Sequence, residues 1–124
     1  MSQGGVQAIV EFLSAKAAEV RRLEARADQA IHQDKDQARY EAVMREKAAL
    51  LAGLARDASG LLDGLDEPLA GEVAERLAAF SASAQQALRL GSVFYMWALL
   101  YPEDYTEGRK NDLEALIARI AGQG

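Results

Sequence analysis

The sequence predicts an all-α protein, an antiparallel helical bundle of three long helices plus a shorter C-terminal fourth helix. Three observations lead to this fold class: apolar residues recur every three or four positions, alanine is abundant, and strand formers are scarce, with a single threonine in the chain. At 124 residues the chain is long enough for one hydrophobic core. We therefore expect a single domain over residues 1–124, in which residues 1–5 form a flexible N-terminal segment.

The first helix is expected at about residues 6–32, where the apolar residues follow a helical period. The polar segment 33–36 ends it. Asp34 is the expected N-cap of the next helix, and Gln37, three residues later, has the position of the second member of a capping box. Because the turn is short, the first two helices should be antiparallel neighbours.

The second helix is expected at about residues 35–59, with an apolar stripe along one face. Glycines and a proline follow it, and these turn-forming residues predict that the helix frays or ends between Ser59 and Gly64. Asp66 is the expected N-cap of the third helix, with Pro68 in its first turn, where the missing N–H costs little.

The third helix is expected to run over residues 69–101, because apolar residues there alternate in steps of four and three. We expect it to continue through Gly91 with a kink; the alternative is a break there, with Ser92 capping a new helix. Pro102 ends it. A shorter fourth helix is expected at about residues 110–121, after a polar loop.

The composition excludes several functional classes. The formal net charge is −5 and acidic residues are interspersed with Arg and Lys, whereas nucleic-acid-binding proteins concentrate basic charge on one surface. The longest apolar run, Val93–Tyr101, is less than half of the roughly 20 residues that a membrane-spanning helix needs. No cysteine is present, which excludes disulfides and thiol chemistry. We expect a cytoplasmic protein with neither a nucleic-acid nor a membrane partner.

No pattern in the sequence indicates catalysis, a cofactor or a metal, so we predict no catalytic, cofactor-binding or metal-binding residues and no enzyme activity. The segment from Glu103 to Glu114 matches a calcium loop in its glycine and its final glutamate, but Tyr105 stands where an oxygen ligand is needed. The alternative is a signalling domain or a ribonuclease that uses His32, the only histidine, as a phosphoacceptor or together with Arg26 in RNA cleavage. A histidine near a helix C-terminus is also favoured by the helix dipole alone.

The segment 93–101 contains half of the aromatic residues of the chain and is apolar around its whole circumference when helical, so it must be covered on more than one side. It is either core or interface, and the sequence leaves both open. We predict a protein–protein interaction module that self-associates through the third helix and this segment, or binds a helical protein partner. A small export or adaptor chaperone is a further alternative. The interface candidates are Phe94, Tyr95, Trp97, Tyr101 and Tyr105.

Overall fold

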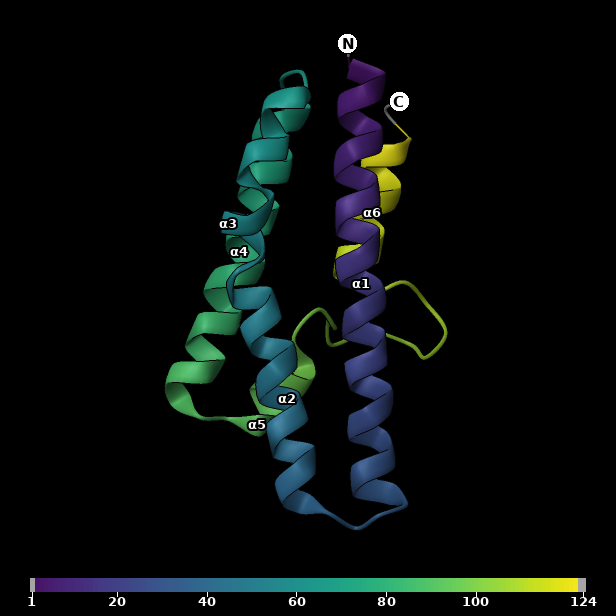
Figure 1. Ribbon diagram of the computed structural model, residues 1–124, viewed down its shortest axis with the longest axis vertical. Helices are drawn as coiled ribbons and strands as arrows, with labels where there is room; N and C mark the ends of the chain where they lie inside the picture. The colour runs from purple at the N-terminus through teal and green to yellow at the C-terminus, as the bar shows by residue number, and fades with distance from the viewer. Residues whose placement is uncertain (1, 123–124) are drawn as a thin grey trace.

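The computed structural model describes residues 2–122, and side chains from residue 4 onward, and all regular elements in that part of the chain are helices (Figure 1). This agrees with the all-α class that the sequence predicts. The elements are α1 (Ser2–His32), α2 (Gln37–Ala52), α3 (Leu54–Ala58), the 3₁₀ helix η1 (Ser59–Gly64), α4 (Leu69–Leu90), α5 (Val93–Ala98) and α6 (Asp112–Ala121).

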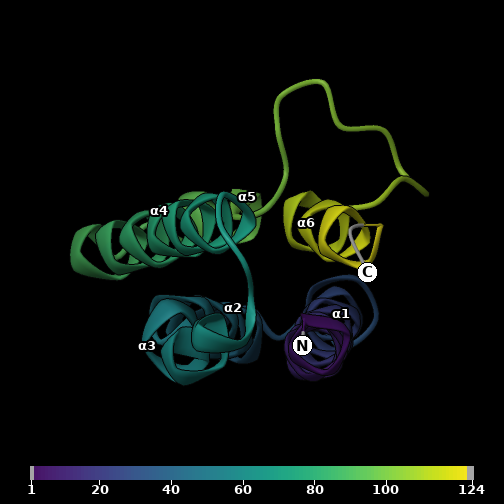
Figure 2. The same ribbon diagram turned by 90° about the horizontal axis from the view of Figure 1, so that it is seen from above.

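The helices form two layers (Figure 2). One layer contains α1 beside α2 and α3; the other contains α4, α5 and α6, and α6 lies against α1. The apolar faces of the two layers form the core, since each amphipathic helix must bury its stripe against another element. The largest fully buried apolar side chains include Ile9, Leu13, Met44, Leu51, Leu54, Leu77, Met96, Leu113 and Ile120.

Residues 2–5, which the sequence analysis assigns to a flexible N-terminal segment, form the first turn of α1. Met1 lies outside the described residues. Gly5 contacts the backbone of Gly64 at the end of η1 so closely that a Cβ atom on Gly5 would overlap the Gly64 carbonyl oxygen. The absence of a side chain at Gly5 therefore allows η1 to pack on the start of α1.

The turn between α1 and α2 is two residues longer than expected, and the N-cap of α2 is Asp36 rather than Asp34. The Asp36 carboxylate accepts a hydrogen bond from the Arg39 backbone N–H at 3.0 Å. The preceding residues instead satisfy the end of α1, because the Asp34 N–H donates to the Gln29 carbonyl and the Asp36 N–H to the Ala30 carbonyl. The Asp34 backbone thus satisfies a carbonyl group at the C-terminal end of α1 and does not cap α2.

The second expected helix is interrupted at Gly53, and the cause is a side chain from another helix. Ser81 of α4 donates from its hydroxyl to the Leu51 carbonyl at 2.9 Å and accepts from the Ala55 N–H at 3.0 Å. These two backbone groups would bond to each other in a continuous α-helix. The inserted hydroxyl replaces that bond, which is a recognised cause of a helix break.

The start of α4 also differs from the expectation. Pro68 is the N-cap, and no side chain caps the helix at that position. Instead, the Glu67 carboxylate accepts from the Gly71 N–H at 3.1 Å, and the Asp66 carbonyl accepts from the Ala70 N–H. Asp66 therefore contributes through its backbone, and the expectation that it is the N-cap was wrong.

The third expected helix is two helices, so the expectation of continuity through Gly91 was wrong. Gly91 adopts a left-handed conformation with φ of 65°, and the Ser92 N–H donates back to the Ala87 carbonyl. This is a common glycine-terminated helix end. The Ser92 side chain then accepts from the Tyr95 N–H at 3.1 Å and begins α5, which is the alternative that the sequence analysis left open.

Candidate functional site

α5 presents three aromatic side chains to solvent. Met96 is fully buried against the core, whereas Phe94, Tyr95 and Trp97 are 69%, 52% and 52% exposed. At 3.6 residues per turn, these three side chains cover an arc of about 160° on the side of α5 opposite Met96. We call Phe94, Tyr95 and Trp97 the aromatic ridge. The protein thus covers one side of α5 and leaves the rest of its apolar surface open.

All large hydrophobic side chains that are exposed in the described part of the chain lie within eight residues of sequence. They are the aromatic ridge and Leu90, which is 59% exposed at the end of α4. The rings of Phe94 and Tyr95 are neighbours, with centroids 5.9 Å apart. A cluster of exposed apolar side chains on one surface is typical of an interaction site, whereas scattered ones are not.

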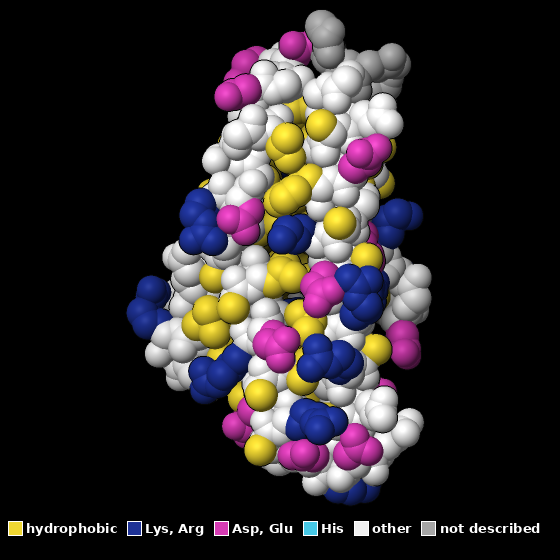
Figure 3. All heavy atoms as spheres, in the orientation of Figure 1, with side chains coloured by type: hydrophobic (Ala, Val, Ile, Leu, Met, Phe, Trp, Pro, Cys, Tyr) yellow, Lys and Arg dark blue, Asp and Glu magenta, His cyan; other side chains and the backbone are white. Residues whose placement is uncertain are grey.

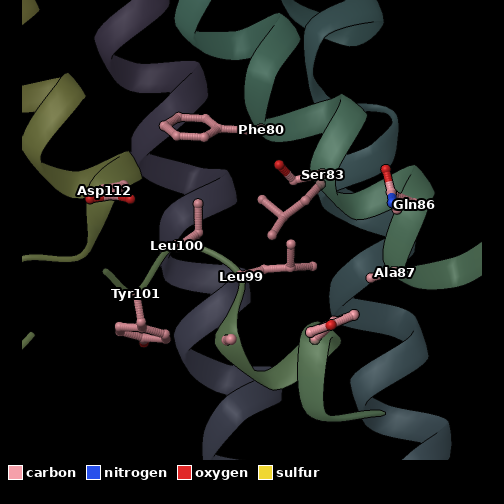
Figure 4. Close-up of a pocket in the computed structure, with 11 residues that line it drawn as sticks. Phe80, Ser83, Gln86, Ala87, Leu99, Leu100, Tyr101 and Asp112 are labelled. Carbon is pink, nitrogen blue, oxygen red and sulfur yellow. The ribbon is translucent and has the colours of Figure 1, made fainter. Parts of the chain in front are cut away.

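A groove of about 470 Å³ lies beside the ridge, between α4 and the chain segment that follows α5 (Figure 4). Phe80, Ser83 and Gln86 of α4 lie on one side of it, and Leu99 and Leu100 lie across from them. We call this cavity the α4–α5 groove. Its full lining is Leu51, Phe80, Ser83, Gln86, Ala87, Tyr95, Ala98, Leu99, Leu100, Tyr101 and Asp112.

The wall of the groove after α5 has an unusual backbone. Leu100 has a φ of 77°, in the left-handed region that favours glycine, although its side chain is buried. Its carbonyl oxygen accepts a hydrogen bond from the Asp112 N–H at 2.9 Å, at the start of α6. A leucine keeps such a conformation only where its surroundings hold it in place, and such residues cluster at functional sites.

A buried lysine forms a hydrogen bond to the backbone of the aromatic ridge. The Lys47 side chain of α2 has no exposed surface, and its Nζ donates to the Trp97 carbonyl oxygen at 2.9 Å. The same Nζ lies 3.1 Å from Oε2 of Glu24 on α1. Burial lowers the pKa of Lys47, and the charge of Glu24 opposes that shift. Lys47 therefore connects α2 to α1 through the ion pair and to α5 through the hydrogen bond.

Tyr101 extends this polar cluster. Its hydroxyl donates to Glu24 Oε1 at 2.6 Å and accepts from Arg21 Nη1 at 3.2 Å. Burial and the hydrogen bond to Glu24 raise the pKa of Tyr101 well above its ordinary value. Tyr105 packs edge-on against the Tyr101 ring at 4.6 Å between centroids and donates to the Arg109 carbonyl. Of the five interface candidates, Tyr101 and Tyr105 thus have their hydroxyls engaged within the protein.

Arg21 joins the cluster to α6. Its guanidinium donates to both carboxylate oxygens of Glu114, at 2.7 and 2.9 Å, a bidentate geometry that strengthens the pair. The hydrogen bond from Arg21 lowers the pKa of Glu114. Glu114 also completes the capping box of α6 with Asn111. We call the connected side chains the Lys47 network: Lys47, Glu24, Tyr101, Arg21 and Glu114.

The Lys47 network was not predicted from the sequence, although the sequence contains one signal for it. Lys47 lies between Met44 and Leu51, in steps of three and four, and therefore occupies a core position of the α2 stripe. A lysine at such a position needs a charged partner. The sequence contains no signal for which glutamate is that partner, because Glu24 approaches it only in the folded helical hairpin.

The structure does not bring His32 and Arg26 together. They are six residues apart on α1, which places them about 120° apart around the helix and about 9 Å apart along its axis. His32 is exposed and lies 3.4 Å from Asp28, whereas Arg26 lies 3.8 Å from Glu46. Glu114, the last position of the rejected calcium loop, is occupied by its pair with Arg21.

Charged side chains of both signs are intermixed over the face formed by α1, α2 and α3 (Figure 3). Arg22 pairs with Glu19 on the same helix. On the face shown, basic residues therefore do not form a continuous surface of one sign. Among residues 2–122, no helix has both the length and the apolar character of a membrane span.

The chain was compared with models of protein families, with curated protein sequences and with solved structures, and none of the three comparisons gave a match.

Proposed function

We propose that this protein is a helical protein–protein interaction module of the cytoplasm that self-associates through α4 and the 93–101 segment. The observation that carries the proposal is the clustering of the exposed large hydrophobic side chains at Leu90 and the aromatic ridge. Aromatic residues are enriched at protein interfaces and dominate their energetics. The three long helices α1, α2 and α4 would then serve as the bundle that presents this surface.

A second copy of the chain is the partner that this surface fits best. In a two-fold symmetric dimer, the same patch on both copies is covered at once. The described part of the chain carries one such cluster of exposed hydrophobic side chains, and a symmetric dimer needs only one. A different partner protein would have to carry its own surface complementary to this cluster.

The exposed side chains of Leu90 and the aromatic ridge supply about half of the area that a standard dimer interface buries, which fits a weak, reversible dimer. Aromatic side chains offer about 150–250 Å² each. With the fractional exposures of the ridge and Leu90, each copy exposes on the order of 450 Å² of apolar surface, over half of the roughly 800 Å² that a standard interface buries per partner. At about 25 cal/mol per Å², burial on both copies gives about 22 kcal/mol before costs. The loss of translational and rotational freedom, the ordering of side chains and the desolvation of polar groups offset most of this gain, so we expect a dissociation constant in the micromolar range.

The experiment that tests the proposal is light scattering of the purified protein over a dilution series that spans this dissociation constant. We expect a dimer at the high end of the series and dissociation on dilution. Phe94→Ala should weaken the dimer at least about tenfold, because interface anchors commonly contribute more than 1.4 kcal/mol. It should leave the thermal stability of the monomer almost unchanged, since the Phe94 ring is largely exposed.

The control is Phe12→Ala, the same chemical change at a partly buried position of α1, a helix that has no contacts with α5 in the described part of the chain. We expect this variant to dimerise like the wild type. A mass of one chain at every concentration would overturn the proposal, and equal weakening by both variants would remove the assignment to the ridge.

A further inference from the structure

The aromatic ridge and the α4–α5 groove lie side by side and share one residue. Tyr95 belongs to the ridge and also lines the groove. The most exposed ridge side chain, Phe94, is its direct neighbour. One surface of the protein thus carries both a projecting phenyl ring and a cavity next to it.

We propose that in the dimer the Phe94 ring of each copy inserts into the α4–α5 groove of the other. This inference rests on the self-association proposed above and specifies how the two copies fit. In an isologous interface, if residue i contacts residue j, then j contacts i, so one ring and one groove per copy give two equivalent insertions. Tyr95, located between ring and groove, then lies near the two-fold axis.

The volume of the groove suits this occupant. A cavity of about 150 Å³ lined by apolar side chains is sufficient to hold benzene. The groove, at about 470 Å³, accommodates the phenyl ring of Phe94 and leaves room for an aliphatic neighbour such as Leu90. Both side chains are exposed, and the helices that carry them, α4 and α5, contact each other.

The chemistry of the groove also suits an aromatic ring. Its lining includes the apolar side chains of Phe80, Ala87, Leu99 and Leu100, and polar side chains from α4 and from the start of α6, which are Ser83, Gln86 and Asp112 (Figure 4). An apolar interior with a polar rim is the usual composition of a protein interface.

The groove is present before any partner binds. Leu99 and Leu100 are buried, and the hydrogen bond from the Asp112 N–H to the Leu100 carbonyl fixes this wall to α6. A preformed groove avoids the entropy cost of ordering a loop on association.

Site-directed cross-linking tests the insertion directly, because the chain has no cysteine of its own. A chain with Phe94→Cys is mixed with a chain carrying Ser83→Cys, and a short bismaleimide is added. The mixed dimer retains one natural insertion, since the second chain keeps Phe94 and the first keeps its groove. We expect efficient cross-linking between positions 94 and 83, and little when Ala82→Cys replaces Ser83→Cys. Ala82 is exposed on α4 next to Ser83 but does not line the groove.

Filling the groove gives an independent readout that leaves the ridge intact. Ser83→Trp should weaken the dimer at least about tenfold, as Phe94→Ala does, because a large side chain then occupies the cavity. Ala82→Trp, the adjacent control, should leave the dimer unchanged.

The possible outcomes separate the two proposals. One set of results would refute the insertion alone: Phe94→Ala dissociates the dimer, Ser83→Trp does not, and position 94 cross-links to position 94 of the other chain. The two ridges would then stack on each other, and self-association would still hold. If the wild-type protein has the mass of one chain throughout, both proposals fail.

Discussion

Lys47→Met is the substitution that tests most sharply whether a buried ion pair holds the aromatic ridge in place. The replacement keeps the length, approximate volume and helix propensity of the side chain and removes its charge. It deletes the hydrogen bond to the Trp97 carbonyl at 2.9 Å and the ion pair with Glu24 at 3.1 Å.

The expected loss follows from what remains behind. Breaking a buried ion pair by removing one partner costs about 3–5 kcal/mol, because the other charge stays buried without compensation. Oε2 of Glu24, which faces Lys47, is buried and has no hydrogen-bond partner, but Oε1 retains the hydrogen bond from the Tyr101 hydroxyl and the ion pair with Arg21 at 3.8 Å. We therefore expect the lower end of that range, a loss of about 3 kcal/mol in the free energy of unfolding.

Urea unfolding followed by far-ultraviolet circular dichroism, at one fixed protein concentration, measures this loss. With a slope of about 1–3 kcal/mol per molar urea for a protein of this size, the midpoint should fall by about 1–3 M. The control is the double variant with Glu24→Gln, in which no carboxylate charge is left unpaired, and it should be more stable than Lys47→Met alone. A Lys47→Met variant within about 0.5 kcal/mol of the wild type would refute the reasoning. So would additive losses in the double variant, because additivity indicates that the two residues do not interact.

Two further predictions concern the ends of α5 and α6. Ser92→Ala should cost about 1 kcal/mol of stability, because its hydroxyl caps α5 by accepting from the Tyr95 N–H. Ser14→Ala, on the exposed side of α1, should cost almost nothing, and urea unfolding compares the two variants. The second prediction concerns pH. Arg21 holds the pKa of Glu114 below its usual 4.5, so this carboxylate stabilises the fold above that pH and loses its effect as the pH falls through the lowered value. The wild type should therefore lose more stability than Glu114→Gln between about pH 6 and pH 3, and equal losses would contradict the pairing.

The sequence was sufficient to predict the helices and their apolar faces, because periodicity and propensity are local properties. One of the two breaks within the expected helices depends on a distant residue. The interruption at Gly53 is caused by Ser81, a hydroxyl 28 residues further along the chain that inserts into the α2–α3 backbone. No local pattern around Gly53 indicates that insertion. At Gly91, by contrast, the glycine followed by a capping serine is a local signal for a break, and these two caps outweigh the heptad-like spacing.

The interface candidates follow from the sequence alone, whereas the exposure of each side chain does not. An all-apolar helix indicates that something covers it, and the aromatic residues of 93–101 were identified on that ground. Which side remains open depends on where α5 lies relative to α2, and that position is determined by contacts such as the one from Lys47 to Trp97. Tyr101 is an aromatic residue of the same apolar segment as Phe94, yet its hydroxyl donates a hydrogen bond to Glu24 within the protein.

α5 has six residues, well below the roughly 12–15 that an isolated helix needs to be stable in water. Its shape is therefore imposed by the rest of the fold, through the Ser92 cap and the Lys47 hydrogen bond. The surface that it presents is consequently a conformational epitope and not a linear one. A peptide with the sequence of residues 90–101 contains the same side chains but does not form that surface. A partner of the ridge would therefore recognise the folded arrangement of α2, α4 and α5 rather than a stretch of sequence.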